Sequence, residues 1–257
     1  MYKNIISLFF VALTFVSPAS QAVNSVDIIT YGDSLTAGLS RTAAEVVTCP
    51  VGVNMELGRF GDDNRQVCYG DGVINRGGYQ PGLASLLLND GVAPIIANYG
   101  FSGIRSDQMI PLLNGVVASR PHAQYVIIMA GANDAVMSVS VSTLLSNLSV
   151  MISQVQSYGL IPVIATVTPN ARASAFERKT KQYSAAIRSY AASNNILLAD
   201  SRAALEGGWE SNNSGDGLHL SAAGNGILAG LFHSTLNLQT SRKVTLSPII
   251  NLLLSDN

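Results

Sequence analysis

A serine that could act as a nucleophile follows the first apolar run of the chain. The run Val26–Tyr31 is followed by Gly32, Asp33, Ser34 and Leu35. A serine hydroxyl is a weak nucleophile and must give its proton to a neighbouring base before it attacks a carbonyl carbon. Ser34 is therefore a candidate only if the chain also supplies a base, because otherwise it simply caps the turn.

His219 is the best candidate for that base, since Asp216 precedes it by three residues. Gly217 permits a tight bend between them, so the carboxylate can reach the imidazole, fix its tautomer and stabilise the imidazolium. The alternative is a polar turn ahead of a helix. His122 and His233 have no carboxylate close by in the sequence and are better explained as structural or exposed residues.

Three donors could stabilise the negative charge that develops on a carbonyl oxygen under attack. They are the backbone N–H groups of Ser34 and Gly103 and the side-chain amide of Asn133. Gly103 comes after the apolar run Pro94–Asn98, and Asn133 comes after Gln124–Ala130. Each alone would be an ordinary turn residue, but all three follow the ends of apolar runs.

Short apolar runs alternate with segments of helical periodicity. The runs are Val26–Tyr31, Pro94–Asn98, Gln124–Ala130, Leu160–Val167 and Asn195–Ala199. The helical segments are Gln80–Asn89, Ser106–Val117, Val141–Ser157, Ala173–Ala192 and Ser221–Phe232. This alternation predicts an α/β domain whose parallel sheet is covered on both faces and carries its functional residues at the carboxyl ends of the strands.

The segment 40–78 breaks the alternation, because it is long, rich in glycine and without periodicity. It contains both cysteines of the chain, Cys49 and Cys68. In an oxidising compartment they predict a disulfide worth on the order of 3 kcal/mol, with two free thiols as the alternative. Because the segment directly follows Ser34, we expect a loop insertion that forms a wall or lid of a pocket.

The N-terminus predicts a secretory signal peptide over residues 1–22. Met1–Asn4 carries one lysine, Ile5–Val16 is almost continuously apolar, and small residues precede the expected cleavage site after Ala22. The alternative is a membrane anchor, but a spanning helix needs roughly 20 apolar residues. We therefore expect export to the periplasm or medium and no stable membrane span in the mature chain.

Composition limits the remaining classes of function. The 257 residues are 47% apolar and carry a net charge of −1, which suits one domain with a sizeable core and offers no attraction for nucleic acid. Two cysteines are too few for a zinc site unless histidines join them, and His219 is better explained as a base, so we expect no metal site. The domain is expected over 23–240, followed by a tail, 241–257, whose apolar part could pack on the domain or contact a partner. Nothing in the sequence indicates the oligomeric state.

Four segments in order resemble the GDSL esterase/lipase family, also called SGNH hydrolases. They are Gly32-Asp33-Ser34-Leu35, Asn98-x-Gly100-x-Ser102-Gly103, Gly131-x-Asn133-Asp134 and Asp216-x-x-His219. The resemblance covers about Val26 to Phe232. It implies a flavodoxin-like, three-layer α/β/α domain with a mainly parallel five-stranded sheet.

The resemblance also implies site residues and a mechanism without a cofactor. Ser34 is the implied nucleophile, His219 the base and Asp216 its orienting partner, and Gly103 and Asn133 complete the oxyanion hole with Ser34. The expected reaction is ester hydrolysis through an acyl-enzyme. Asp33 belongs to the first motif but receives no catalytic assignment.

The substrate is less defined than the chemistry. Gly77-Gly78-Tyr79 is similar to a segment of some carbohydrate esterases of the family, so Tyr79 and Trp209 are candidates for stacking on a sugar, although Trp209 could equally pack under its loop. Arg105 replaces a small polar residue and makes the wall beside the oxyanion hole either cationic or salt-bridged. An acetylated glycan and a lipid ester both remain open. A secreted glycan-binding or surface-interaction protein on a hydrolase scaffold is the non-enzymatic alternative.

Overall fold

The computed structural model of the protein describes residues 24–38, 46–48, 55–57, 74–76 and 78–236. The expected signal peptide, Cys49, Cys68 and the tail 241–257 lie outside these residues. The cleavage site and the disulfide therefore stay predictions.

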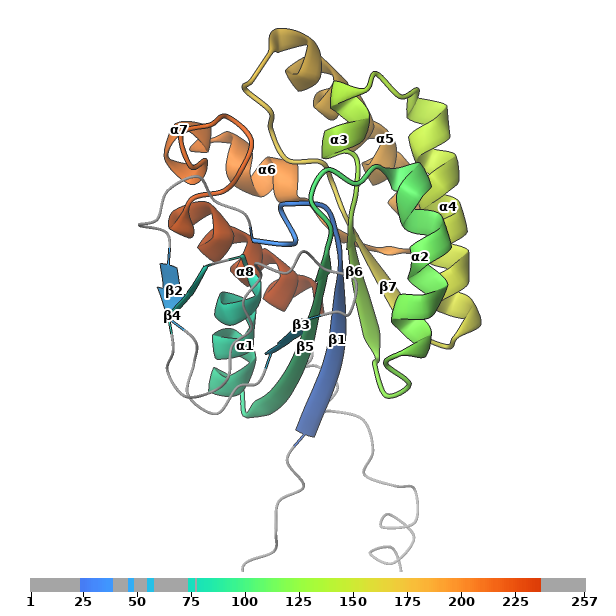
Figure 1. Ribbon diagram of the computed structural model, residues 1–257, viewed down its shortest axis with the longest axis vertical. Coiled ribbons are helices and arrows are strands. Elements are labelled where there is room, and N and C mark those ends of the chain that lie inside the picture. The colour runs from blue at the N-terminus through green and yellow to red at the C-terminus, as the bar shows by residue number, and fades with distance from the viewer. Residues whose placement is uncertain (1–23, 39–45, 49–54, 58–73, 77, 237–257) are drawn as a thin grey trace, which may run out of the picture.

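The described residues form a parallel sheet with the strand order β3-β5-β1-β6-β7-β8 (Figure 1). Its strands are β1 (Asn24–Gly32), β3 (Met55–Leu57), β5 (Val92–Gly100), β6 (Tyr125–Met129), β7 (Ile161–Ala165) and β8 (Leu197–Ala199). Five of them are the strands that the apolar runs predict. The sixth, β3, comes from the segment 40–78 and adds a short edge strand. The same segment supplies an antiparallel pair, β2 (Val46–Thr48) and β4 (Ile74–Arg76), so it contains more regular structure than a loop.

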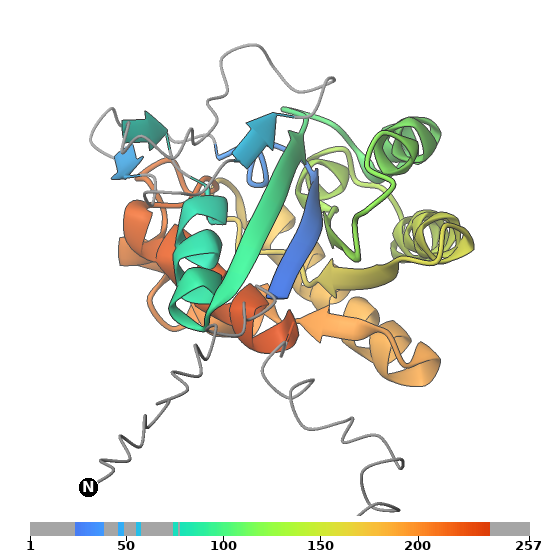
Figure 2. The ribbon, with the colours of Figure 1, turned by 90° about the horizontal axis from the view of Figure 1, so that it is seen from below.

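Helices cover both faces of the sheet (Figures 1 and 2). The five expected helices are α1 (Gln80–Asn89), α2 (Ser106–Ala118), α4 (Val141–Ser157), α5 (Ser174–Asn194) and α8 (Ala222–Leu236). On one side α1 packs against α8, and on the other α4 packs against both α2 and α5. Among the described helices, none combines the length and apolar character needed to cross a membrane.

Three further helices are too short for their periodicity to be recognised in the sequence. They are α3 (Ala132–Val136), α6 (Ser201–Glu206) and α7 (Trp209–Asn212). Each follows a strand or another helix at the end of the sheet where the strands finish. They therefore shape the loops of that end rather than the core.

The core forms because the central strands are apolar on both faces. Ile28 and Ile29 are neighbours on β1 and point to opposite faces, yet both are completely buried. The same holds for Val126 and Ile127 on β6. A strand buried on both sides is what a parallel sheet between two helical layers requires.

Strand register brings three loops to one edge of the sheet. Gly32 at the end of β1 lies opposite Gly100 of β5 and Met129 of β6. The turn after β1 packs closely on the end of β5, because a Cβ on Gly100 would lie only 2.2 Å from the nitrogen of Ala37. The segments that follow β1, β5 and β6 therefore begin at the same level.

Candidate active site

Ser34, His219 and Asp216 are joined by hydrogen bonds although Ser34 and His219 are 185 positions apart in the chain. The Nε2 atom of His219 lies 3.0 Å from the Oγ atom of Ser34. Its Nδ1 atom lies 2.7 Å from Oδ2 of Asp216. The structure thus brings together the three residues in the order expected for nucleophile, base and orienting carboxylate.

A tight turn after β1 places the Ser34 hydroxyl. The backbone N–H of Ala37 donates to the carbonyl of Asp33 at 2.9 Å, and the N–H of Leu35 donates to Oδ1 of Asp33 at 2.9 Å. The Gln80 side chain of α1 donates to the Thr36 carbonyl at 2.7 Å. These three hydrogen bonds hold the turn that carries Ser34 in one conformation.

The Asp33 carboxyl group is held in an environment that disfavours its charge. The residue is only 2% exposed. Burial raises the pKa of Asp33 from 3.8 to about 7; the Leu35 N–H opposes this effect, and the nearby Asp134 carboxylate adds to it. The Asp33 carboxyl group is therefore largely protonated below neutral pH, and it accepts a hydrogen bond within the turn that carries Ser34.

The Asp216 carboxylate has the opposite environment. Burial of its side chain would raise its pKa, but hydrogen bonds from the backbone of Leu218 and His219, from the His219 ring and from Arg172 outweigh that effect. The pKa of Asp216 consequently lies well below its ordinary value. The group is ionised wherever His219 could work as a base.

The two remaining oxyanion candidates lie in adjoining loops. Asn133 sits in the first turn of α3, and its side-chain Nδ2 donates to the carbonyl of Ile104 at 2.9 Å. Gly103 precedes Ile104, has a left-handed backbone (φ +77°) and is exposed. It belongs to an open depression that is also lined by Phe101, Ser102, Ile104, Gln108 and Leu112.

A buried carboxylate ties these loops together. Asp134, completely buried, accepts hydrogen bonds from the N–H of Ser106 at 3.0 Å and from its hydroxyl at 2.5 Å, and Asn147 donates to the same hydroxyl at 2.8 Å. Ser106, the first residue of α2, is thus a buried partner of Asp134. Sequence reasoning missed this use of Asp134, although the residue stands beside Asn133 in its motif.

The three residues predicted to contact the substrate differ in their surroundings. The expectation for Tyr79 is wrong, because its ring is fully buried and lies 4.6 Å from that of Phe232, which leaves no face for a sugar. Arg105 follows the salt-bridged alternative, with Nη2 2.9 Å from Oδ2 of Asp107. Trp209 is half-buried and packs against the hydrophobic core.

Arg172 is the site residue that sequence reasoning did not identify. It lies in the loop between β7 and α5, 44 positions before Asp216, and donates to both the side chain and the backbone carbonyl of that residue. No motif marks it. The one signal available was its place after the carboxyl end of a predicted strand.

The described residues contain no cluster of three or more His, Cys, Asp or Glu side chains suited to a metal ion. Of the other histidines, His233 on α8 lies 2.7 Å from Oδ2 of Asp90, and His122 is exposed.

Comparison with models of protein families identifies one family. The model of the GDSL-like Lipase/Acylhydrolase family matches residues 30–227. A search of curated protein sequences finds no match.

Solved structures share the fold. An acetylxylan esterase from Geobacillus stearothermophilus has a TM-score of 0.61 at 20% identity, with 84% of this chain and 96% of that chain covered. A lipase/acylhydrolase from Enterococcus faecalis has a TM-score of 0.61 at 20% identity, with 83% and 96% covered. A member of the lipolytic protein G-D-S-L family from Veillonella parvula has a TM-score of 0.60 at 17% identity, with 84% and 98% covered.

Proposed function

Because the chain belongs to the GDSL-like lipase/acylhydrolase family and is an ester-hydrolysing enzyme, we propose that it cleaves carboxylic esters with the triad Ser34, His219 and Asp216. The observation that carries the proposal is the pair of contacts at 3.0 Å and 2.7 Å on the two nitrogens of His219. The presence of all three catalytic positions in hydrogen-bond contact argues against the non-enzymatic binding protein considered above.

In the first step, Nε2 of His219 takes the proton of the Ser34 hydroxyl. The Oγ atom then forms a bond to the ester carbonyl carbon, and the carbonyl π electrons move onto oxygen. When the tetrahedral intermediate collapses, the alcohol leaves with the proton that His219 returns. The acyl group remains on Ser34.

In the second step, water gives a proton to His219 and attacks the acyl carbon. The Ser34 oxygen leaves and recovers that proton, so the acid is released and the enzyme is restored. Asp216 holds the Nδ1–H of His219 throughout. Its depressed pKa keeps it an acceptor over the whole working range of pH.

The oxyanion is assigned to the N–H groups of Ser34 and Gly103 and to the Asn133 amide. The common level at which β1, β5 and β6 end supports this assignment. An amide nitrogen has two hydrogens, so Asn133 can serve an oxyanion as well as Ile104. Loss of one such donor costs about 10²- to 10³-fold in kcat.

We propose export on the strength of the N-terminal composition, and either a glycan acetyl ester or a lipid ester as substrate. The acetylxylan esterase among the structural relatives supports testing the first. Hydrolysis of p-nitrophenyl esters with two to sixteen acyl carbons separates them: a maximum at acetyl favours the glycan, and a maximum at long chains favours the lipid.

The direct test is Ser34→Ala, assayed with p-nitrophenyl acetate. We expect kcat to fall by at least about 10³-fold, since the nucleophile is removed while substrate binding remains. Ser153→Ala, an exposed serine of α4, is the control, and both variants should unfold at the wild-type temperature. A fluorophosphonate probe should label the control and not Ser34→Ala. Wild-type activity in Ser34→Ala would refute the assignment.

A further inference from the structure

We infer that Arg172 is a positioning residue of the reaction, which fixes the Asp216 carboxylate against His219 and offsets part of its charge. The inference rests on the proposed function, because it assigns Arg172 a task within the proposed triad. Arg172 itself does not touch the reacting atoms.

Contact geometry gives Arg172 control over the orientation of Asp216. Its Nη2 donates to Oδ2, the oxygen that also accepts from Nδ1 of His219, and its Nε donates to the Asp216 backbone carbonyl at 3.1 Å. The other carboxylate oxygen, Oδ1, accepts the N–H groups of Leu218 at 2.9 Å and His219 at 2.8 Å. With both oxygens engaged, rotation of the carboxylate would break several bonds at once. A planar guanidinium presents its donors in a fixed fork, so it can hold the side chain and the main chain of Asp216 in one geometry, whereas an ammonium on a flexible stem fixes neither.

The charge of Arg172 matters because its partner is shielded from water. The Asp216 side chain is 2% exposed and that of Arg172 is 31% exposed. The charged groups that these hydrogen bonds place next to the imidazole are Asp216, which contacts it directly, and Arg172 on the β7–α5 loop, which contacts Asp216. Arg172 is the cation of this set, and it reduces the negative charge that an imidazolium at His219 would experience.

Bonds within the β7–α5 loop hold Arg172 in place. The N–H of Arg172 donates to Oδ1 of Asn170 at 3.2 Å, and the N–H of Ala171 donates to the carbonyl of Gly217 at 2.7 Å. Asn170 is completely buried, and its own N–H donates to Oε2 of Glu177 at 2.9 Å. The loop is therefore tied both to the Asp216 loop and to α5.

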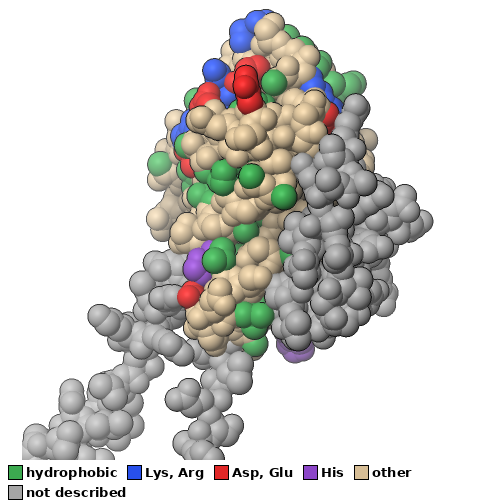
Figure 3. Space-filling model, turned by 90° about the vertical axis from the view of Figure 1, so that its left-hand side faces the viewer, with side chains coloured by type: hydrophobic (Ala, Val, Ile, Leu, Met, Phe, Trp, Pro, Cys, Tyr) green, Lys and Arg blue, Asp and Glu red, His purple; other side chains and the backbone are tan. Residues whose placement is uncertain are grey.

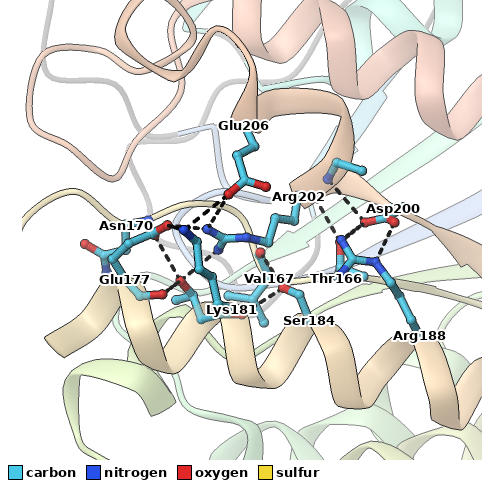
Figure 4. A network of polar contacts seen from close by, with 12 residues as sticks. Thr166, Val167, Asn170, Glu177, Lys181, Ser184, Arg188, Asp200, Arg202 and Glu206 are labelled. Carbon is cyan, nitrogen blue, oxygen red and sulfur yellow. Dashed lines mark hydrogen bonds and ion pairs between the residues drawn. The ribbon is translucent and has the colours of Figure 1, made fainter. Parts of the chain in front are cut away.

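An ion cluster around the buried Arg202 side chain lies at the far end of this chain of contacts (Figure 4). Arg202 of α6, 2% exposed, pairs with Glu177, lies 3.3 Å from Glu206 and donates to Thr180 at 3.0 Å. Figure 3 shows that charged side chains of both signs gather toward the upper end of the molecule. Contacts thus run from α6 through Glu177 and Asn170 to Arg172 and the triad.

The test compares Arg172→Ala and Arg172→Lys with the control Arg178→Ala, an exposed arginine of α5 whose one described contact is with Ser174 at 3.5 Å. Rates with p-nitrophenyl acetate are measured from pH 5 to 9 and divided by the fluorophosphonate-titrated enzyme. Arg172→Ala should lower kcat about ten- to a hundredfold with KM little changed, and should move the acid limb of kcat/KM upward by up to about one pH unit. Arg172→Lys should keep the acid limb and recover part of kcat, because it restores charge without the fork.

Glu177→Gln provides a second measurement, because it loosens the loop while Arg172 keeps its charge. It should lower kcat several-fold without moving the acid limb. If Arg172→Ala only lowers the unfolding temperature, with an unchanged kcat and pH profile, the residue is structural and the inference is wrong. If Ser34→Ala is inactive in that case, the proposed triad still holds and only the role of Arg172 is refuted. An active Ser34→Ala would overturn the triad, and this inference with it.

Discussion

Two aspartates adjoin the Ser34–His219 pair, and their pKa values are shifted in opposite directions. Asp33 is buried as a whole residue, whereas Asp216 is partly exposed although its side chain is shielded from water. Yet the pKa of Asp33 is raised to about 7, whereas that of Asp216 lies well below its usual value. Burial alone cannot explain both results.

The donors around each carboxylate explain the difference. Asp216 accepts two backbone N–H groups, a ring N–H and a guanidinium, whereas the bonds that favour ionised Asp33 come from backbone N–H groups alone and it faces the carboxylate of Asp134. Desolvation sets the cost of a charge, and the number and charge of the donors decide whether that cost is met. The same residue type therefore serves as an ion in one loop and as a nearly neutral acid in the other.

The largest expected effect follows from exchanging Asp216 for a neutral isostere. Asp216→Asn should reduce kcat by about 10⁴-fold, because an amide nitrogen facing Nδ1 imposes the wrong tautomer on His219. Asp33→Asn is the matched variant and should change kcat by no more than about threefold, since Asn Oδ1 still accepts the Leu35 N–H. Equal losses of kcat with p-nitrophenyl acetate would remove the distinction between the two aspartates.

Sequence spacing predicts the proposed triad but not the opposite pKa shifts of the two aspartates. Asp216 lies three residues from His219, so their contact is local and the motif predicts it. Arg172 is 44 positions away, and its approach depends on how the β7–α5 loop folds over the Asp216 loop. Nothing in the sequence near Asp33 shows that burial and the Asp134 carboxylate raise its pKa.

The fold, like the site, was predictable in its main elements but not in its short ones. Apolar runs locate the five main strands because a two-sided burial requires continuous apolar sequence. α3, α6 and α7 have only four to six residues, too few for a helical repeat to be visible. Tyr79 was misassigned for the same reason that Arg172 was missed, since its partner Phe232 belongs to a helix at the other end of the domain sequence.

The next largest effect concerns how the free energy of unfolding depends on pH. The contributions of the two aspartates to this dependence should have opposite slopes. The pKa of Asp33 is raised in the folded state. Its contribution to the free energy of unfolding is therefore present in full below about pH 4 and is lost as pH rises through about 7. Asp33→Asn should therefore gain on the order of 4 kcal/mol over the wild type between pH 4 and 7.

Asp216 has a lowered pKa, so its contribution is present above about pH 4 and is lost as pH falls further. Asp216→Asn should accordingly be less stable than the wild type at pH 6, with a gap that narrows on acidification below pH 4. Urea unfolding of the three proteins across this range measures both slopes. Parallel curves would contradict the assigned pKa shifts.

The smallest expected effect concerns two glycines on either side of Asp216. Gly215 and Gly217 both have left-handed backbones, with φ +84° and +75°, so alanine at either position should cost about 1 kcal/mol of stability. A Cβ on Gly217 would lie 3.1 Å from the nitrogen of Arg172 and 3.2 Å from the carbonyl carbon of Ala171, whereas a Cβ on Gly215 meets nothing within 4 Å.

Gly217→Ala should therefore push the β7–α5 loop away and lower kcat a few-fold, while Gly215→Ala should lose stability alone. The difference in kcat between the two variants therefore measures how much the close contact between the β7–α5 loop and the Asp216 loop contributes to the reaction. Steady-state rates and urea unfolding at pH 7.5 measure both variants. If the two variants have the same kcat, close contact between these loops does not set the environment of Asp216, and the contrast with Asp33 must come from the backbone N–H donors alone.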